Sequence, residues 1–251
     1  MSKLVLSEGH VSPDSPISVQ LIKNHHRVDK ILSDSAMATD DIQILISYAL
    51  WSQWGQIAVE REVTARTARG ELVAQHRHGQ ESASAMLTEL LASMVAISAA
   101  AHALDAFYGQ LVTPAIKKDG PKDDKGREAH IRECLKRRFD TGKRDREWVS
   151  RFQRLFDLRD AAVHAEVKSL PAVPHPSGVG NAGQVNADYS AEEAVKAVDL
   201  MLDVLNTCVQ NPKPSDAEAE AWAVGYGRAV ETLTTQLRVS CDARPLVIYR
   251  G

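Results

Sequence analysis

The stretch LFDLRDAAVHA, residues 155–165, decides how the chain is interpreted, because an apolar helix face and a group of charged side chains meet in it. Its apolar residues recur at three- and four-residue spacing, which predicts the end of an amphipathic helix that faces a core (Leu155, Leu158, Ala162). Three ionisable residues stand among them, namely Arg159, Asp160 and His164. Buried charge is costly unless it is paired, so these three residues require an explanation.

Two explanations fit this stretch. In the structural one, Asp160 and His164 lie four residues apart, share a helix face and hydrogen-bond to each other. Arg159 then extends to solvent or pairs with an acid from another helix. In the functional one, a cation and a titratable imidazole are held beside a phosphate group. Composition and spacing leave both explanations open.

The same three residues carry a resemblance to a known family. Arg159, polar Asp160, three further residues and His164 resemble the R-polar-x(3–4)-H signature of HEPN domains, many of which are metal-independent ribonucleases. The resemblance covers about residues 82–210. It implies a four-helix core, RNA as the substrate, and roles in phage defence or in a toxin–antitoxin system with a partner protein.

The resemblance also implies a mechanism for this site. A ribose 2′-OH attacks the adjacent phosphorus, and the strand breaks to leave a 2′,3′-cyclic phosphate. His164 acts as general base or acid, because the pKa of histidine is ordinarily near neutrality. Arg159 stabilises the charge of the transition state through its planar fork of donors. Asp160 orients His164 or positions the substrate, although it adds negative charge beside a phosphate.

A fourth candidate site residue is Asp105, within the sequence LDAF at 104–107. By the resemblance, it matches an acid on the first helix of the core that reaches the Arg159 and His164 pair. The alternative is an ordinary acid at the edge of an apolar helix stripe. The residues alone do not separate these two roles.

Helix geometry predicts a homodimer if the motif is active. Five residues at about 100° each place Arg159 and His164 about 140° apart around a straight helix. The two side chains therefore converge only if the helix is distorted near the following loop, or if two copies of the motif face one cleft. We expect the second arrangement.

The apolar periodicity predicts an all-α protein, an antiparallel helical bundle with two long helices. We expect these helices over residues 18–32, 39–78, 82–111, 127–139, 145–164, 190–208 and 215–237. The predicted organisation is an N-terminal arm and long helix (1–81), a HEPN-like core (82–210), and a C-terminal helix with a short strand (211–251), all in one compact unit. Residues 246–249 have β character and pair with 4–6 in this prediction.

Two further predictions concern where side chains lie. The helix over 39–78 becomes polar after Val59, so we expect its second half to face solvent or a partner chain. We expect Trp51 and Trp54 in the core, with an interface between chains as the alternative. Residues 170–189 are rich in proline and glycine and predict an irregular loop. His175, in this loop, is interpreted as a surface histidine, with a second catalytic histidine or a substrate contact as the alternatives.

Composition favours a cytoplasmic protein without a cofactor. Cys134, Cys208 and Cys241 are far apart and form no CxxC pair, which argues against a zinc site or a disulfide framework. The N-terminus shows no secretory signal, and the apolar stretch 94–106 is too short to span a membrane. No nucleotide-binding, zinc-protease or serine-hydrolase motif occurs, so we expect no cofactor and no metal.

The charge distribution is compatible with RNA binding. Residues 117–160 contain 15 basic and 10 acidic side chains, whereas the remainder contains 15 and 23. A mildly basic strip therefore leads into Arg159. Three functions remain open: a HEPN-type ribonuclease, a non-catalytic HEPN-like protein that binds RNA or nucleotide, and a helical interaction subunit of a defence or toxin–antitoxin system.

Overall fold

The computed structural model describes residues 17–23, 42–112, 126–164, 171–243 and 246. The chain divides into two compact units, residues 1–50 and 51–251. The long helix that the sequence groups with the N-terminal arm belongs to the larger unit, and the predicted organisation with boundaries at 81/82 and 210/211 stays a prediction. The predicted pairing of 4–6 with 246–249 lies outside the described residues, except for Leu246.

The smaller unit contains an antiparallel strand pair where the sequence analysis expected helix. Strands β1 (Ile17–Lys23) and β2 (Ile42–Tyr48) pair with Ile17 opposite Tyr48 and Lys23 opposite Ile42. The predictions of helix are therefore wrong over 18–23 and 42–48, whereas residues 24–41 lie outside the described residues. The segment IQILISY is rich in β-branched residues, which lose side-chain freedom in a helix and pack well in a strand. Its apolar residues also alternate, and the helical spacing competed with that pattern.

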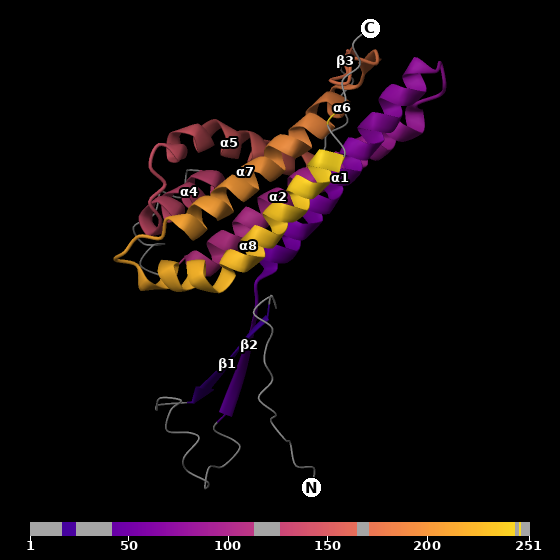
Figure 1. The fold of residues 1–251 in the computed structure, drawn as a ribbon. Coiled ribbons are helices and arrows are strands. Elements are labelled where there is room, and N and C mark those ends of the chain that lie inside the picture. The colour runs from indigo at the N-terminus through magenta and orange to yellow at the C-terminus, as the bar shows by residue number, and fades with distance from the viewer. Residues whose placement is uncertain (1–16, 24–41, 113–125, 165–170, 244–245, 247–251) are drawn as a thin grey trace, which may run out of the picture. The chain divides into compact units, whose positions relative to one another are not determined.

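The larger unit is helical, which confirms the all-α fold class (Figure 1). Its long helices are α1 (Leu50–Arg77), α2 (Ala83–Leu111) and α8 (Ala217–Ala243), and its shorter ones are α4 (Arg127–Arg138), α5 (Arg144–Val163), α6 (Gln184–Asp188) and α7 (Ala191–Gln210). Helices α1 and α2 are antiparallel, since Trp51 lies against Phe107 while Arg69 bonds to Glu89. The loop after α5 is more regular than expected, because it contains the short hairpin β3 (Val173–Pro174) and β4 (Asn181–Ala182) as well as α6.

Helix α2 is the central element of the bundle and contacts α4, α5, α6 and α7 (Figure 1). Its buried face is dominated by small side chains, which allow neighbouring helices to approach closely (Ala92, Ala96, Ala99, Ala100, Ala101, Ala103). Among the described helices, α2 alone is long and apolar enough to cross a membrane, and 56% of its most apolar window is buried inside the bundle. Leu87, Leu91 and Val95 on the same helix are exposed, so its apolar surface extends beyond the face that the bundle covers.

An aromatic cluster fills one end of the bundle. Trp222 of α8 stacks near Phe107 of α2, with ring centroids 4.5 Å apart, and near Trp51 of α1 at 5.7 Å. Phe139, which follows α4, closes the cluster at 6.0 Å from Trp222. The predicted core position of Trp51 is confirmed, since its side chain is fully buried. That of Trp54 is wrong, because Trp54 is 37% exposed and stacks on His102 at 4.9 Å.

A buried ion network joins three helices at the other end. Arg69 of α1 donates two hydrogen bonds to Glu89 of α2, at 2.9 and 2.6 Å, and also bonds to Glu192 of α7, at 2.6 Å for one of its two contacts. The backbone N–H of Ala191 donates to Glu89 at 2.9 Å. Burial raises the pKa of Glu192, but the hydrogen bonds from Arg69 outweigh it and leave that pKa below its ordinary value.

The network corrects the expectation for the polar half of α1. Arg69 is fully buried within the chain itself, and so is Glu62, which pairs with Arg66 one turn further along α1. Neither residue faces solvent or a partner chain. An alternating run of acids and bases looks solvated in sequence, but carboxylates on α2 and α7 satisfy the guanidinium of Arg69 inside the bundle.

We predict that Arg69→Ala destabilises the fold by about 3–5 kcal/mol, because it leaves the buried Glu89 and the partly buried Glu192 without a counter-charge. Arg69→Lys retains the charge but cannot bridge both carboxylates with a planar fork, so its loss should be intermediate. The exposed Arg61→Ala on the same helix is the control and should change stability by about 0.5 kcal/mol or less. Urea denaturation midpoints measure all three, and an Arg69→Ala midpoint equal to that of the control would contradict the prediction.

Candidate functional site

Helix α5 carries the motif at its carboxyl end. Acids in its first turn, Asp145 and Glu147, complement the helix dipole, and Trp148, Phe152 and Leu155 are buried inward. The helix ends at Val163, and His164 has left the helical conformation, with φ −112° and ψ 36°. The backbone N–H of His164 still donates to the carbonyl of Asp160 at 2.9 Å. The angle of about 140° between Arg159 and His164 assumes a straight helix. It therefore does not apply to His164, which lies outside the helix.

Arg159 is held by its own helix. Its Nε and Nη2 both donate to one carboxylate oxygen of Asp160, at 2.8 and 2.6 Å. Its guanidinium also lies over the ring of Phe156, 4.6 Å from the centroid. The side chain is 18% exposed, so the cation is fixed in place yet reachable from solvent.

Asp160 and His164 are both exposed at the same helix end. The carboxylate of Asp160 forms an ion pair with Arg159. The predicted side-chain hydrogen bond between Asp160 and His164 stays a prediction. The three motif residues are thus together on one exposed end of α5. The pairing of Arg159 with Asp160 partly neutralises the cation that a phosphate would meet.

Asp105 lies elsewhere. Its carboxylate accepts a hydrogen bond of 2.5 Å from Nε of Arg127 at the start of α4, and the same guanidinium covers the ring of Tyr108. The motif end of α5 lies near Glu89, in the first half of α2. Tyr189 donates to the carbonyl of Leu158 in α5, and Ala191, two residues after Tyr189, donates to Glu89. Glu89 and Asp105 are sixteen residues apart, about 24 Å along the helix. The structure does not bring Asp105 to Arg159.

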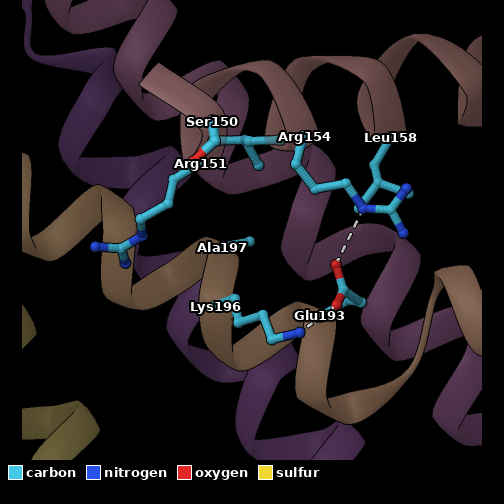
Figure 2. Close-up of a pocket in the computed structure, with 8 residues that line it drawn as sticks. Ser150, Arg151, Arg154, Leu158, Glu193, Lys196 and Ala197 are labelled. Atoms are coloured by element: carbon cyan, nitrogen blue, oxygen red, sulfur yellow. Dashed lines mark hydrogen bonds and ion pairs between the residues drawn. The ribbon is translucent and has the colours of Figure 1, made fainter. Parts of the chain in front are cut away.

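A groove between α5 and α7 adjoins the motif and was not predicted from the sequence. Its volume is about 470 Å³. Figure 2 shows the residues that line it. Figure 2 shows Arg154 and Lys196 converging on Glu193, which accepts from Arg154 at 3.2 Å and from Lys196 at 2.6 Å. The groove brings Arg151 and Arg154, three residues apart on α5, together with Lys196 of α7. The sequence does not show that α5 and α7 pack together, so it does not predict this group of basic side chains.

His175 is buried, which overturns its interpretation as a surface histidine. It sits in the loop of the β3–β4 hairpin, where the backbone N–H of Ser177 donates to its Nδ1 at 3.2 Å and the Ser177 hydroxyl lies 2.7 Å from the same atom. Nδ1 is therefore an acceptor, and the ring is neutral with its proton on Nε2. Burial lowers the pKa of His175, and the charge of Arg69 lowers it further, against the effect of Glu89 and Glu192.

The buried thiols and the acids form no evident reaction centre. Cys134 and Cys208 are buried and free, and burial raises the pKa of Cys134 to about 11, so its reactive thiolate is scarce. Within the described ranges, no three His, Cys, Asp or Glu side chains gather as a metal site would require.

No family model, curated protein or solved structure matches this chain. The resemblance to HEPN domains therefore rests on the motif residues and on their place at the end of a bundle helix.

We predict that stability falls as the pH drops below about 6.5, the ordinary pKa of histidine, through the neutral His175. A group whose folded pKa is lowered adds stability above its unfolded pKa, and that stability is lost as the pH falls through the folded value. His175→Asn keeps an acceptor for the N–H of Ser177 but cannot titrate. The difference in melting temperature between wild type and His175→Asn should shrink from pH 7.5 to pH 5.5. His130→Asn on α4 is the control, and an equal pH profile for both variants would contradict the assignment.

Proposed function

We propose that this protein is a metal-independent endoribonuclease of the HEPN type, acting on RNA in the cytoplasm in phage defence or as part of a toxin–antitoxin system. The observation that carries the proposal is the exposure of the motif. A pair used for packing would lie among core partners, whereas Arg159 is partly exposed and His164 is exposed at the helix end. A reacting phosphate can reach both residues from solvent.

In the proposed reaction, the ribose 2′-OH forms a bond to phosphorus, and the bond from phosphorus to the 5′-oxygen of the next nucleotide breaks. The products are a 2′,3′-cyclic phosphate and a 5′-hydroxyl end. One imidazole takes the proton of the 2′-OH, and an acid returns a proton to the leaving oxygen. His164 serves as one of these groups. Arg159 stabilises the charge that develops on the non-bridging oxygens.

Asp160 determines which N–H donors of Arg159 are available to a phosphate. Its carboxylate occupies Nε and Nη2 of the guanidinium, which has five N–H donors in all. A bound phosphate must share the fork with Asp160 or displace it. Asp160 therefore pre-orients the guanidinium at some cost in affinity for the anion.

We also propose that the active form is a homodimer, with the two motifs facing one cleft. Since one α5 supplies one imidazole, a second copy supplies the second proton-transfer group that the reaction uses. Because His164 has left the helix, the helix angle no longer requires a dimer, and the proposal rests on the second proton-transfer group. A separate antitoxin or defence partner remains part of the proposal.

The alternative is a non-catalytic HEPN-like subunit that binds RNA, nucleotide or a protein partner. The pairing of Arg159 with Asp160 favours it, because a guanidinium that already bonds to a carboxylate binds a phosphate more weakly. The two proposals differ in one measurable property, which is whether bound RNA is cut.

We predict that purified protein cleaves single-stranded RNA in EDTA and leaves 2′,3′-cyclic phosphate ends. His164→Ala should slow cleavage by about 10²–10⁴-fold, the usual contribution of general acid–base catalysis. Arg159→Ala should abolish cleavage, and Arg159→Lys should also lose most of it because the planar fork is gone. Both alanine variants should keep the fold and lose little stability, since the cation–π contact of Arg159 contributes about 0.5–2 kcal/mol at a partly exposed site.

The matched controls are Arg146→Ala, an exposed arginine near the start of α5, and His130→Ala on α4. Both should cleave at the wild-type rate. If motif variants melt early while cleavage is unchanged, Arg159 and His164 are structural and the nuclease proposal fails. If wild type binds RNA but leaves it intact, the non-catalytic alternative holds.

A further inference from the structure

The groove between α5 and α7 has an apolar floor and a charged rim. Leu155, Leu158 and Ala197 form the floor, and three basic side chains with one acidic side chain form the rim: Arg151, Arg154, Lys196 and Glu193 (Figure 2). The sequence of each helix alone gives no such concentration of charge, because α7 begins with two acids and α5 mixes both signs. The antiparallel packing of the two helices creates it.

Three of the residues that line the groove are basic and one is acidic, and the neighbouring acids Asp188, Asp199 and Asp203 offset part of this charge. Glu193 accepts hydrogen bonds from both Arg154 and Lys196, so one carboxylate serves two cations. Asp188 supplies a second carboxylate to Arg154 at 2.9 Å. Arg154 is thereby fixed in position, while Lys196, with 68% of its side chain exposed, retains donors for another partner.

Arg151 is the least engaged cation of the rim. The nearest carboxylate oxygen, on Asp203, lies 3.8 Å from its Nη1, beyond hydrogen-bonding distance. Asp203 is itself occupied by hydrogen bonds from Arg144 and from the indole N–H of Trp148. With 39% of its side chain exposed, Arg151 can turn to an incoming anion without breaking a short contact.

The position of the groove indicates an elongated ligand. Leu158 lines the groove and directly precedes Arg159 of the motif. Arg151 and Arg159 are eight residues apart, about 12 Å along the helix. A polyanion that lies across this stretch can contact both ends. The apolar floor and the guanidinium planes also suit the flat faces of unpaired bases, which stack on arginine in RNA-binding proteins.

We propose that the α5–α7 groove is a subsite for single-stranded RNA, in which Arg151 and Lys196 contact phosphates that flank the one held at Arg159. The flanking role rests on the proposed nuclease function, whereas RNA binding in the groove stands independently of cleavage. Single-stranded RNA fits better than a duplex because an unpaired strand exposes the faces of its bases to the floor.

The test uses the full chain and a fluorescent single-stranded oligoribonucleotide methylated at every 2′-oxygen, which lacks the nucleophile and cannot be cut. Anisotropy gives its dissociation constant over a series of salt concentrations. We expect Arg151→Ala and Lys196→Ala each to weaken binding several-fold. Each should also reduce the slope of log K against log salt by about 0.7, the value for one lost phosphate contact on a single strand.

Arg146→Ala is the matched control for this measurement. It is an exposed arginine on the same helix, five residues before Arg151 and therefore about 140° around the axis from it. It should leave both the affinity and the salt slope unchanged. The melting temperature of Arg151→Ala should equal that of wild type, because Arg151 makes no short ion pair.

Two results would overturn the inference: wild type that does not bind the probe at low salt, or Arg151→Ala and Lys196→Ala that bind like Arg146→Ala. A cleavage assay separates this failure from that of the proposed function. Cleavage that depends on His164, with KM unchanged in Arg151→Ala, means that the groove is not the subsite while the nuclease stands. Binding that depends on Arg151, without any cleavage by wild type, means that the groove binds RNA and the nuclease proposal fails.

Discussion

The buried ion network around Arg69 is the interaction on which the rest of the larger unit depends. One guanidinium joins α1 to α2 through Glu89 and to α7 through Glu192. The backbone N–H of Ala191 donates a further hydrogen bond to Glu89. Buried ion pairs are often no more stabilising than apolar packing, but they tolerate few alternative arrangements. The network therefore fixes the register of three helices, and α5 packs against two of them, α2 and α7.

The functional surface follows from that register. Because α7 is fixed, α5 packs antiparallel to it through the bonds from Trp148 to Asp203 and from Arg154 to Glu193. These contacts form the groove and leave the last turn of α5 exposed. The site candidates are therefore on the surface of a rigid scaffold, while the aromatic cluster around Trp222 and the small side chains of α2 supply the packing beneath them.

The sequence predicted the helices of the bundle well, because long apolar periodicities such as that of α2 have no competing interpretation. It failed for β2, where residues 42–48 satisfy helical and strand spacing alike and only pairing with β1 decides. It failed for Arg69 and Glu62, because a charge that is satisfied by a distant carboxylate looks the same in sequence as a solvated one. His175 was misplaced for a similar reason, since its partner is a serine two residues away in a tight loop. The motif residues Arg159, Asp160 and His164 were found together because they are local in sequence. The groove was not found, since its two walls come from separate helices.

The hydrogen bond from the Tyr189 hydroxyl to the carbonyl of Leu158 marks the boundary between two parts of α5 that differ in how firmly they are held. Residues before it are held by the core, whereas those after it, from Arg159 to His164, are attached by little more than the helix's own backbone bonds. Local opening of a helix end requires far less free energy than global unfolding. Amide hydrogens beyond Leu158 are therefore expected to exchange with solvent well before those of Phe152 and Leu155. The end of the helix that carries the motif can thus rearrange around a bound strand while the bundle beneath it stays intact.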